Sequence, residues 1–197
     1  MVDVMILKNN NKGMILTKFI ILFVILIIIV ISGFYIFKYY FYPLKHFDIV
    51  QREAKNNNID PYLVLSIIKC ESNFNKHATS AKNARGLMQI MDTTAQDVNN
   101  QTNLVEEINN SNIYDEEINI ALGCKYFASL IKKYNGNYYL AICAYNAGMG
   151  NVDSWIEDGI IDENLDDHVN SNIPISETRN YLNRVINSYK IYKWLYK

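Results

Sequence analysis

The chain has 197 residues, which is enough for one domain of ordinary size but too few for two full ones. Half of the residues are hydrophobic, a fifth are charged and only 3 are Pro, which excludes a disordered or collagen-like protein. The net charge of -1 and the pI of about 6.3 leave no basic surface of the kind that binds nucleic acid, so we expect no nucleic-acid partner.

Charge is unevenly distributed along the chain. Residues 1–47 contain five Lys and one acid, whereas residues 48–197 contain the other 14 basic and 19 acidic residues, a net charge of -5. The sequence therefore divides into a short basic, apolar leader and a mildly acidic body. The body has 150 residues, which is enough to bury a core without disulfides or metal.

The first predicted element is a transmembrane anchor over residues 19–37, preceded by a short basic N-terminal segment over residues 1–18. The run FIILFVILIIIVISGFYIF is uncharged and has no polar face, and about 20 apolar residues cross a bilayer. A cleaved signal peptide is the rival interpretation. The run is longer than a usual signal core and no small-x-small cleavage site follows it, so we expect an uncleaved anchor. Nearby tyrosines fit an interfacial aromatic belt: Tyr35, Tyr39, Tyr40 and Tyr42.

Lysines lie on both sides of the apolar run, so the positive-inside rule does not decide its orientation. Residues 38–55 are predicted to form a juxtamembrane linker and a first helix, and residues 56–197 the main domain. The side on which this domain lies must therefore be argued from its substrate.

The body is predicted to be nearly all helical. Asp60-Pro61 is an N-cap followed by Pro at the first helical position, which opens a helix over 62–72. Asp115 opens a long helix that ends in two lysines before Asn135-Gly136, with charges that suit the helix dipole. Further helices are predicted over 93–99, over 138–145 and from 176 to about 195, and we find no pair of alternating strands joined by a hairpin turn.

Glu71 is the most informative residue of the first of these helices. It shares a helix face with the apolar residues three, four and seven positions before it. A carboxylate on an apolar face is unfavourable unless it is paired or protonated, and desolvation raises its pKa until it can donate a proton near neutrality. From this helix alone, the rival interpretation is the stronger one: a Glu that faces solvent or pairs with Lys69 or Lys76.

Three later segments favour a functional role for Glu71. Ser72 follows it directly, and Gly86–Gln89 (GLMQ) begins fifteen residues after it, where Gly86 indicates close backbone approach or an unusual backbone angle. Gln, Asn and Tyr side chains hydrogen-bond sugars well, because they are neutral and form directional bonds. Such residues recur in Ala144–Gly148 (AYNAG) and Glu177–Tyr181 (ETRNY).

Together and in this order, these segments resemble lytic transglycosylases of the soluble lytic murein transglycosylase (SLT) type. The resemblance extends over about residues 60–189. It implies a mainly α, goose-type lysozyme-like fold, with residues 56–197 as the catalytic domain. It also implies cleavage of the β-1,4 bond between N-acetylmuramic acid and N-acetylglucosamine in peptidoglycan, with formation of a 1,6-anhydromuramoyl end.

By this resemblance, Glu71 is the single catalytic acid and base. Ser72 and Tyr181 are expected to orient it. An ordinary glycosidase needs two carboxylates, and the matched segments contain only one other acid, Glu177, which we expect to be structural.

Four further side chains take roles from the same resemblance. Gln89 and Asn146 are expected to hydrogen-bond the sugar or the catalytic groups. Met88 is expected to form an apolar wall of the cleft that helps to keep the acid protonated. Tyr145 is either a sugar contact or a ring of the core.

The sequence departs from the family pattern at several positions. Asn83 stands where Gly is usual, but Asn tolerates a left-handed backbone. Asp92 stands where Pro is common and is expected to cap the next helix instead. Cys124 and Cys143 replace small residues and lie on different predicted helices, which leaves open a disulfide between them.

No motif predicts a cofactor or a metal. A Gly-rich phosphate loop is absent from the sequence, and His46, His77 and His168 have no metal-binding spacing. Cys70 adjoins Glu71 but has no His near it in sequence, so a small buried thiol is preferred over a nucleophile.

The leading interpretation is a single-pass membrane protein with an extracytoplasmic lytic transglycosylase domain. Its partners would be peptidoglycan glycan strands and, by analogy only, a secretion or conjugation machine. The alternatives are a hydrolytic muramidase on the same fold, a non-catalytic wall-binding scaffold, and a cytoplasmic helical protein of unrelated role.

Overall fold

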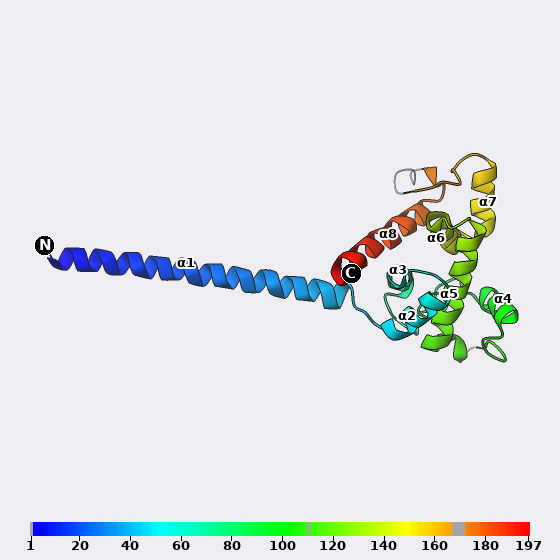
Figure 1. Cartoon of the computed structure of the whole chain (residues 1–197), viewed down its shortest axis with the longest axis horizontal. Coiled ribbons are helices and arrows are strands. Elements are labelled where there is room, and N and C mark those ends of the chain that lie inside the picture. Colours follow the sequence, from blue (N-terminus) through cyan, green and yellow to red (C-terminus); the bar gives the residue numbers. More distant parts are fainter. Residues whose placement is uncertain (1, 110, 167–171) are drawn as a thin grey trace. The chain divides into compact units, whose positions relative to one another are not determined.

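The computed structural model describes residues 2–109, 111–166 and 172–197 and divides the chain into two compact units, residues 1–44 and 45–197. The first unit contains one long helix, α1 (Val2–Ile36), extended by a π-helical turn, η1 (Phe37–Phe41) (Figure 1). The helix includes most of the predicted basic segment, because residues 2–18 contain no Pro that would end it. The segment from Met14 to Phe41, which includes η1, is long and apolar enough to cross a membrane. A signal sequence also meets this criterion of length and composition.

The second unit is helical, which confirms the prediction of a mainly α domain. Within the described ranges it has no strand, only two isolated bridges that join Arg85 to Thr79 and to Ile90. Its helices are α2 (Phe47–Asn56), α3 (Pro61–Ser72), α4 (Asp92–Thr102), α5 (Glu116–Lys133), α6 (Tyr138–Ala147), α7 (Met149–Glu157) and α8 (Ser176–Tyr196), with a short 3-10 turn, η2 (Asn112–Tyr114).

Side-chain caps fix where three of these helices begin. Asp60 accepts a hydrogen bond from the backbone N–H of Tyr62 at the start of α3, as its position before Pro61 predicts. Asp115 caps α5 in the same way. Asn137, which the sequence pattern did not single out, caps α6.

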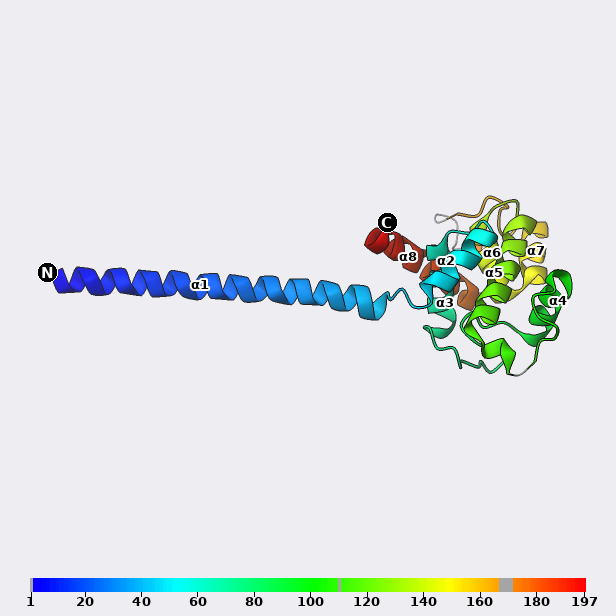
Figure 2. The same ribbon diagram turned by 60° about the horizontal axis from the view of Figure 1, so that its bottom comes forward.

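Helix α3 lies at the centre of the domain. Every residue of its middle, Leu63 to Ile68, is buried, because α2 and α8 both pack against it. Helix α8 also packs against α6, and α6 against α5, so α3, α8 and α6 lie next to one another (Figures 1 and 2). This packing brings the ends of helices that are distant in sequence to one place.

One expectation about local structure was wrong, and one helix was missed. Asp92 is the first residue of α4 and not its cap, because its carboxylate pairs with Arg85 and accepts a hydrogen bond from Asn83 instead. Helix α7 was not predicted: its start lies between Gly148 and Gly150, which resemble a stop signal, but it buries Val152 and Trp155 against the domain.

Candidate active site

Glu71 lies in the last turn of α3. The helix ends directly after it, because Asn73 adopts a left-handed backbone (φ 48°) and its N–H bonds to the carbonyl of Lys69. The side chain of Glu71 is half-buried. Lys76, one of the two alternative ion-pair partners, pairs with Glu116 at 2.8 Å instead.

Tyr181 holds the carboxyl group of Glu71. Its hydroxyl donates a hydrogen bond to Glu71 Oε1 at 2.5 Å, although the two residues are 110 positions apart in sequence. Tyr181 is itself only 2% exposed, so the packing of α8 against α3 fixes the position of its ring. The structure therefore brings together the two ends of the predicted site.

Burial raises the pKa of Glu71 to about 7. The hydrogen bond from Tyr181 and the positive charge of Arg184 oppose this shift, because both favour the charged form. Arg184 is exposed on α8 and lies with its guanidinium carbon 6.0 Å from the ring centroid of Tyr181. Sequence reasoning did not select Arg184, although its position three residues after Tyr181 on a helix indicates the same face.

Ser72 does not contact Glu71 through any hydrogen bond that the structure describes. Its hydroxyl donates to the carbonyl oxygen of Leu87 at 2.8 Å and approaches that of Ile68 at 3.2 Å. Ser72 therefore connects the end of α3 to the Gly86–Gln89 turn. It positions the backbone of that turn and does not position the carboxyl group of Glu71.

The Gly86–Gln89 turn packs on a buried amide. Gly86 has a φ of 76°, and a Cβ atom there would lie 2.3 Å from the side-chain nitrogen of Asn119, which confirms the close approach expected from the sequence. The side chain of Asn119 is fully buried and makes three hydrogen bonds to backbone groups of Arg85, Met88 and Ile113. Sequence reasoning missed Asn119. The signal that could have revealed it is a single amide residue between Ile118 and the apolar stretch IALG that follows.

Gln89 is half-buried and adopts a left-handed backbone (φ 49°). Its side-chain nitrogen donates to the carbonyls of Ala78 and Gly86 at 3.1 and 2.9 Å, so the amide is fixed by backbone. Met88 differs from the expectation of a cleft wall: its side chain is fully buried and lies against Gly123 of α5.

Tyr145 and Asn146 lie in the last turn of α6. The hydroxyl of Tyr145 donates to the carbonyl of Met88 at 2.8 Å, and its ring lies 5.9 Å from that of Phe127. Asn146 Oδ1 accepts a hydrogen bond from the hydroxyl of Thr178 at 2.8 Å, which joins α6 to the first turn of α8. Tyr145 therefore links α6 to the GLMQ turn. The sequence did not reveal that Thr178 is the partner of Asn146.

Gln89 and Tyr145 thus belong to one hydrogen-bonded framework with the end of α3 that carries Glu71, whereas Asn146 is held by Thr178 of α8. Tyr145 bonds to Met88, next to Gln89, and Ser72, next to Glu71, bonds to Leu87 in the same turn. Glu177 is exposed in the first turn of α8. The arrangement presents one acid of raised pKa that is hydrogen-bonded by the Tyr181 hydroxyl. Burial raises the pKa of the Tyr145 phenol, and this acid lies close enough for its charge to raise that pKa further.

All three cysteines are free thiols, so Cys124 and Cys143 form no disulfide. Both are buried, and burial raises the pKa of Cys143 to about 12 and also that of Cys70. Within the part of the chain that the structure describes, no group of three or more His, Cys, Asp or Glu is placed to hold a metal. His168 lies outside the described residues.

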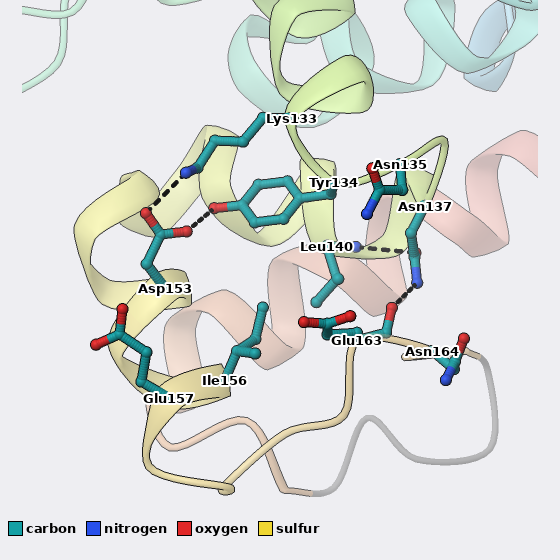
Figure 3. Close-up of a pocket in the computed structure, with 10 residues that line it drawn as sticks. All are labelled: Lys133, Tyr134, Asn135, Asn137, Leu140, Asp153, Ile156, Glu157, Glu163 and Asn164. Carbon is teal, nitrogen blue, oxygen red and sulfur yellow. Dashed lines mark hydrogen bonds and ion pairs between the residues drawn. The ribbon is translucent and has the colours of Figure 1, made fainter.

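A separate pocket of about 430 Å³ lies among the ends of α5, α6 and α7 (Figure 3). Asp153 on its wall is paired with Lys133 at 2.9 Å and accepts a hydrogen bond from the hydroxyl of Tyr134 at 3.0 Å. None of the predicted site residues lines it. Its lining consists of Lys133, Tyr134, Asn135, Asn137, Leu140, Asp153, Ile156, Glu157, Glu163 and Asn164.

Comparison with known sequences identifies one domain family. Residues 48–163 match the family described as Transglycosylase SLT domain, which is more than half of the chain. The membrane-bound lytic murein transglycosylase C of Edwardsiella ictaluri is 33% identical over 167 residues, which cover 76% of this chain and 46% of that protein. The soluble lytic murein transglycosylase of Escherichia coli is 30% identical over 145 residues, covering 74% of this chain and 22% of that protein. The chain thus spans half or less of the length of these relatives.

Solved structures show the same similarity. The 70 kDa soluble lytic transglycosylase of Escherichia coli matches with a TM-score of 0.71 and 29% identity, over 78% of this chain and 25% of that one. An inactive Glu-to-Gln mutant of the lytic transglycosylase Slt from Pseudomonas aeruginosa matches with a TM-score of 0.70 and 30% identity, over 78% and 24% of the two chains. Both matches therefore cover most of this chain but only about a quarter of the larger proteins.

Proposed function

The chain belongs to the transglycosylase SLT domain family, and from this premise we propose that it is a peptidoglycan lytic transglycosylase. Its substrate is the glycan strand, cut at the β-1,4 bond between N-acetylmuramic acid and N-acetylglucosamine. The product carries a 1,6-anhydromuramoyl end. The names of its relatives, which are murein transglycosylases, support this substrate class.

In this proposal Glu71 is both acid and base. Its neutral carboxyl first gives a proton to the glycosidic oxygen as the bond from that oxygen to C1 breaks. The resulting carboxylate then takes the proton of the muramoyl 6-hydroxyl while that oxygen bonds to C1. Glu71 ends the cycle protonated, and no water enters the product.

The observation that carries the proposal is the half-buried carboxyl of Glu71, with a pKa of about 7 and one hydrogen bond from Tyr181. Such a group is protonated in a large fraction of molecules near neutral pH and can also act as a base, which a single-residue mechanism requires. Retaining and inverting glycosidases use a second carboxylate within about 10 Å. Among the charges that shift the pKa of Glu71 in the described part of the chain, none is a second carboxylate.

The neutral groups around Glu71 take the sugar. In this proposal the half-buried side chains of Asn146 and Gln89 present their amides to the sugar, and the half-buried ring of Tyr145 lies against it. Charge that develops at C1 is stabilised by the acetamido group of the substrate itself. Ser72, Met88 and Asn119 hold the GLMQ turn under this surface and do not touch the sugar.

The substrate also decides the side of the membrane. Peptidoglycan lies outside the cytoplasmic membrane, so we propose that the apolar helix is a single-pass anchor and that residues 45–197 face the wall. The apolar span from Met14 to Phe41 and the membrane-bound relative support this location. An enzyme held near the membrane clears wall locally, as a secretion or conjugation machine or wall growth would require.

Replacement of Glu71 by Gln tests the proposal. Digestion of purified peptidoglycan by the full chain should release 1,6-anhydro muropeptides, identified by mass, and E71Q should lower their release by a factor of about 10² to 10⁴. The matched control is Glu177→Gln, which removes the exposed acid of α8 and should retain activity. Reducing ends in place of anhydro ends would show a hydrolase, and unchanged release by E71Q would refute the catalytic role of Glu71.

A further inference from the structure

The last two turns of α8 and the residue after them carry a stripe of basic and aromatic side chains, of which Lys193 is half-buried and the others are exposed. Lys190, Lys193, Trp194 and Lys197 follow the spacing i, i+3, i+4, i+7 and so lie on one helix face. Trp194 is 70% exposed, whereas Tyr192 and Leu195 on the opposite face are buried. We call these four residues the C-terminal stripe.

Charge sets the C-terminal stripe apart from the rest of the body. Helix α8 and Lys197, which follows it, hold five basic residues and a single acid, Glu177, and that acid lies in the first turn of the helix. The body as a whole carries 14 basic and 19 acidic residues, a net charge of -5. The stripe is therefore the basic end of an acidic domain.

The stripe lies at the end of the domain where the chain enters it. The hydroxyl of Tyr62, at the start of α3, donates to the backbone carbonyl of Tyr196 at 3.0 Å. The ring of Tyr62 also stacks on that of Phe47, the first residue of α2, at 5.9 Å between centroids. About two turns earlier on α8, the hydroxyl of Tyr189 donates to Asp60 at 2.8 Å. Contacts inside the larger unit thus join the last turns of α8 to its entry point.

The connection from the entry point to the candidate membrane span is short. The span ends at Phe41 and α2 begins at Phe47. Six residue steps of extended chain reach at most about 20 Å. Any membrane that holds the span therefore lies within this reach of the start of α2.

We propose that the C-terminal stripe is a docking surface for anionic phospholipid head groups of the membrane that holds the anchor. Tryptophan prefers the interface between head groups and acyl chains, and lysines near the surface are attracted by anionic lipid. This inference rests on the proposed membrane anchor but not on the proposed chemistry. Because α8 rises about 1.5 Å per residue, docking would set Tyr181 and its partner Glu71 on the order of 20 Å along the helix from Trp194.

Fluorescence of Trp194 tests the proposal in the full chain. The other tryptophan, Trp155, is buried, and Trp155→Phe leaves Trp194 as the only reporter. The protein is reconstituted into phosphatidylcholine vesicles with or without phosphatidylglycerol, with brominated acyl chains as the quencher. We expect strong quenching only with phosphatidylglycerol, and a loss of quenching at high salt.

Charge variants give the test its control. Each Lys→Gln change at positions 190, 193 and 197 should lower the ratio of docked to undocked domain about five-fold. Lys132→Gln, the same change on α5, should leave it unchanged. E71Q should dock as the parent does while it loses muropeptide release, which separates this inference from the proposed reaction.

Several outcomes would overturn the proposal. Equal quenching in both kinds of vesicle, or quenching that the stripe variants do not reduce, would show that lipid charge is not recognised. Shielding of Trp194 in detergent that grows with protein concentration would show that a second copy covers the stripe. Failure of the protein to float with vesicles of either composition would remove the anchor and this inference with it.

Discussion

Opposing effects act on the pKa of Glu71, and burial is the largest of them. Burial at the end of α3 favours its neutral form, whereas the Tyr181 hydroxyl and the Arg184 charge favour the carboxylate. The balance leaves its pKa at about 7, close to the pH at which a general acid and base is most effective. The effect of each opposing group on the pKa of Glu71 should therefore be measurable in the pH dependence of the reaction.

Tyr181→Phe should shift the alkaline limb of the pH profile upward. The variant removes a hydrogen bond that favours the charged form, so the pKa of Glu71 should rise by roughly one unit. Activity that needs the neutral acid then persists to higher pH, while kcat falls about ten-fold because the carboxyl loses its orientation. Rates of muropeptide release across pH measure both effects. Tyr145→Phe, whose hydroxyl bonds to Met88 and not to Glu71, is the control, and an identical shift in it would disprove the assignment.

The raised pKa of Glu71 also predicts that this residue destabilises the fold above neutral pH. Between about pH 4.5 and about 7 the folded state holds a proton that the unfolded state has released, so stability falls as pH rises through this range. E71Q cannot ionise and should lack this loss, which amounts to at most about 3 kcal/mol. Thermal unfolding of both proteins across this range measures the difference. Parallel stability curves would contradict a buried, ionising Glu71.

At the scale of elements, the GLMQ turn is held by one buried amide from α5. Asn119 bonds to backbone groups on both sides of Gly86, and Ser72 and Tyr145 add hydrogen bonds from α3 and α6. Three helices therefore fix a segment that has no regular structure of its own. Its geometry should be sensitive to small changes in the space around Gly86.

Gly86→Ala should destabilise the domain by about 3 kcal/mol, because the added Cβ meets Asn119 and the backbone is left-handed. Gly136→Ala is the matched control: its φ is 89°, but nothing lies within 4 Å of the added atom. The control should lose only the backbone contribution, about 1 kcal/mol. Denaturant unfolding gives both values, and equal losses would show that the contact with Asn119 does not matter.

At the scale of the whole molecule, the chain consists of a long apolar helix and a helical domain of 153 residues, Lys45–Lys197. The domain carries the candidate site in full, since Glu71, the GLMQ turn, the end of α6 and the start of α8 all belong to it. In the proposed function, the apolar helix holds the domain at the membrane. Whether this helix stays attached decides where the domain works.

The uncleaved anchor predicts that the protein isolated from membranes has its full mass of 22.9 kDa. The apolar run should hold it in the membrane against alkaline extraction, because transfer of the span to water is strongly unfavourable. Mass spectrometry of the membrane fraction and protease treatment of intact cells check the length and the side. A shorter, extractable protein would identify a cleaved signal sequence instead.

The sequence by itself determined the features that depend on neighbouring residues. Helix α3 begins at Asp60-Pro61 and α5 at Asp115 because a cap acts within one helical turn, and both starts were predicted. The membrane-length run and the left-handed turn at Asn83 were predictable for the same reason. The order of the four motifs was sufficient to identify the family before any geometry was known.

Only the tertiary structure decided which of those residues meet. The hydrogen bond from Tyr181 to Glu71 joins residues 110 positions apart; the family resemblance predicted this pair, but no local pattern encodes it, and the predicted contact of Ser72 with Glu71 did not form. Ser72 donates to the carbonyl of Leu87, and Met88 packs into the core where Gly123 has no side chain to exclude it. Burial and long-range hydrogen bonds are properties of the packed domain, so the pKa of the acid and the roles of its neighbours appear only once α3, α6 and α8 have come together.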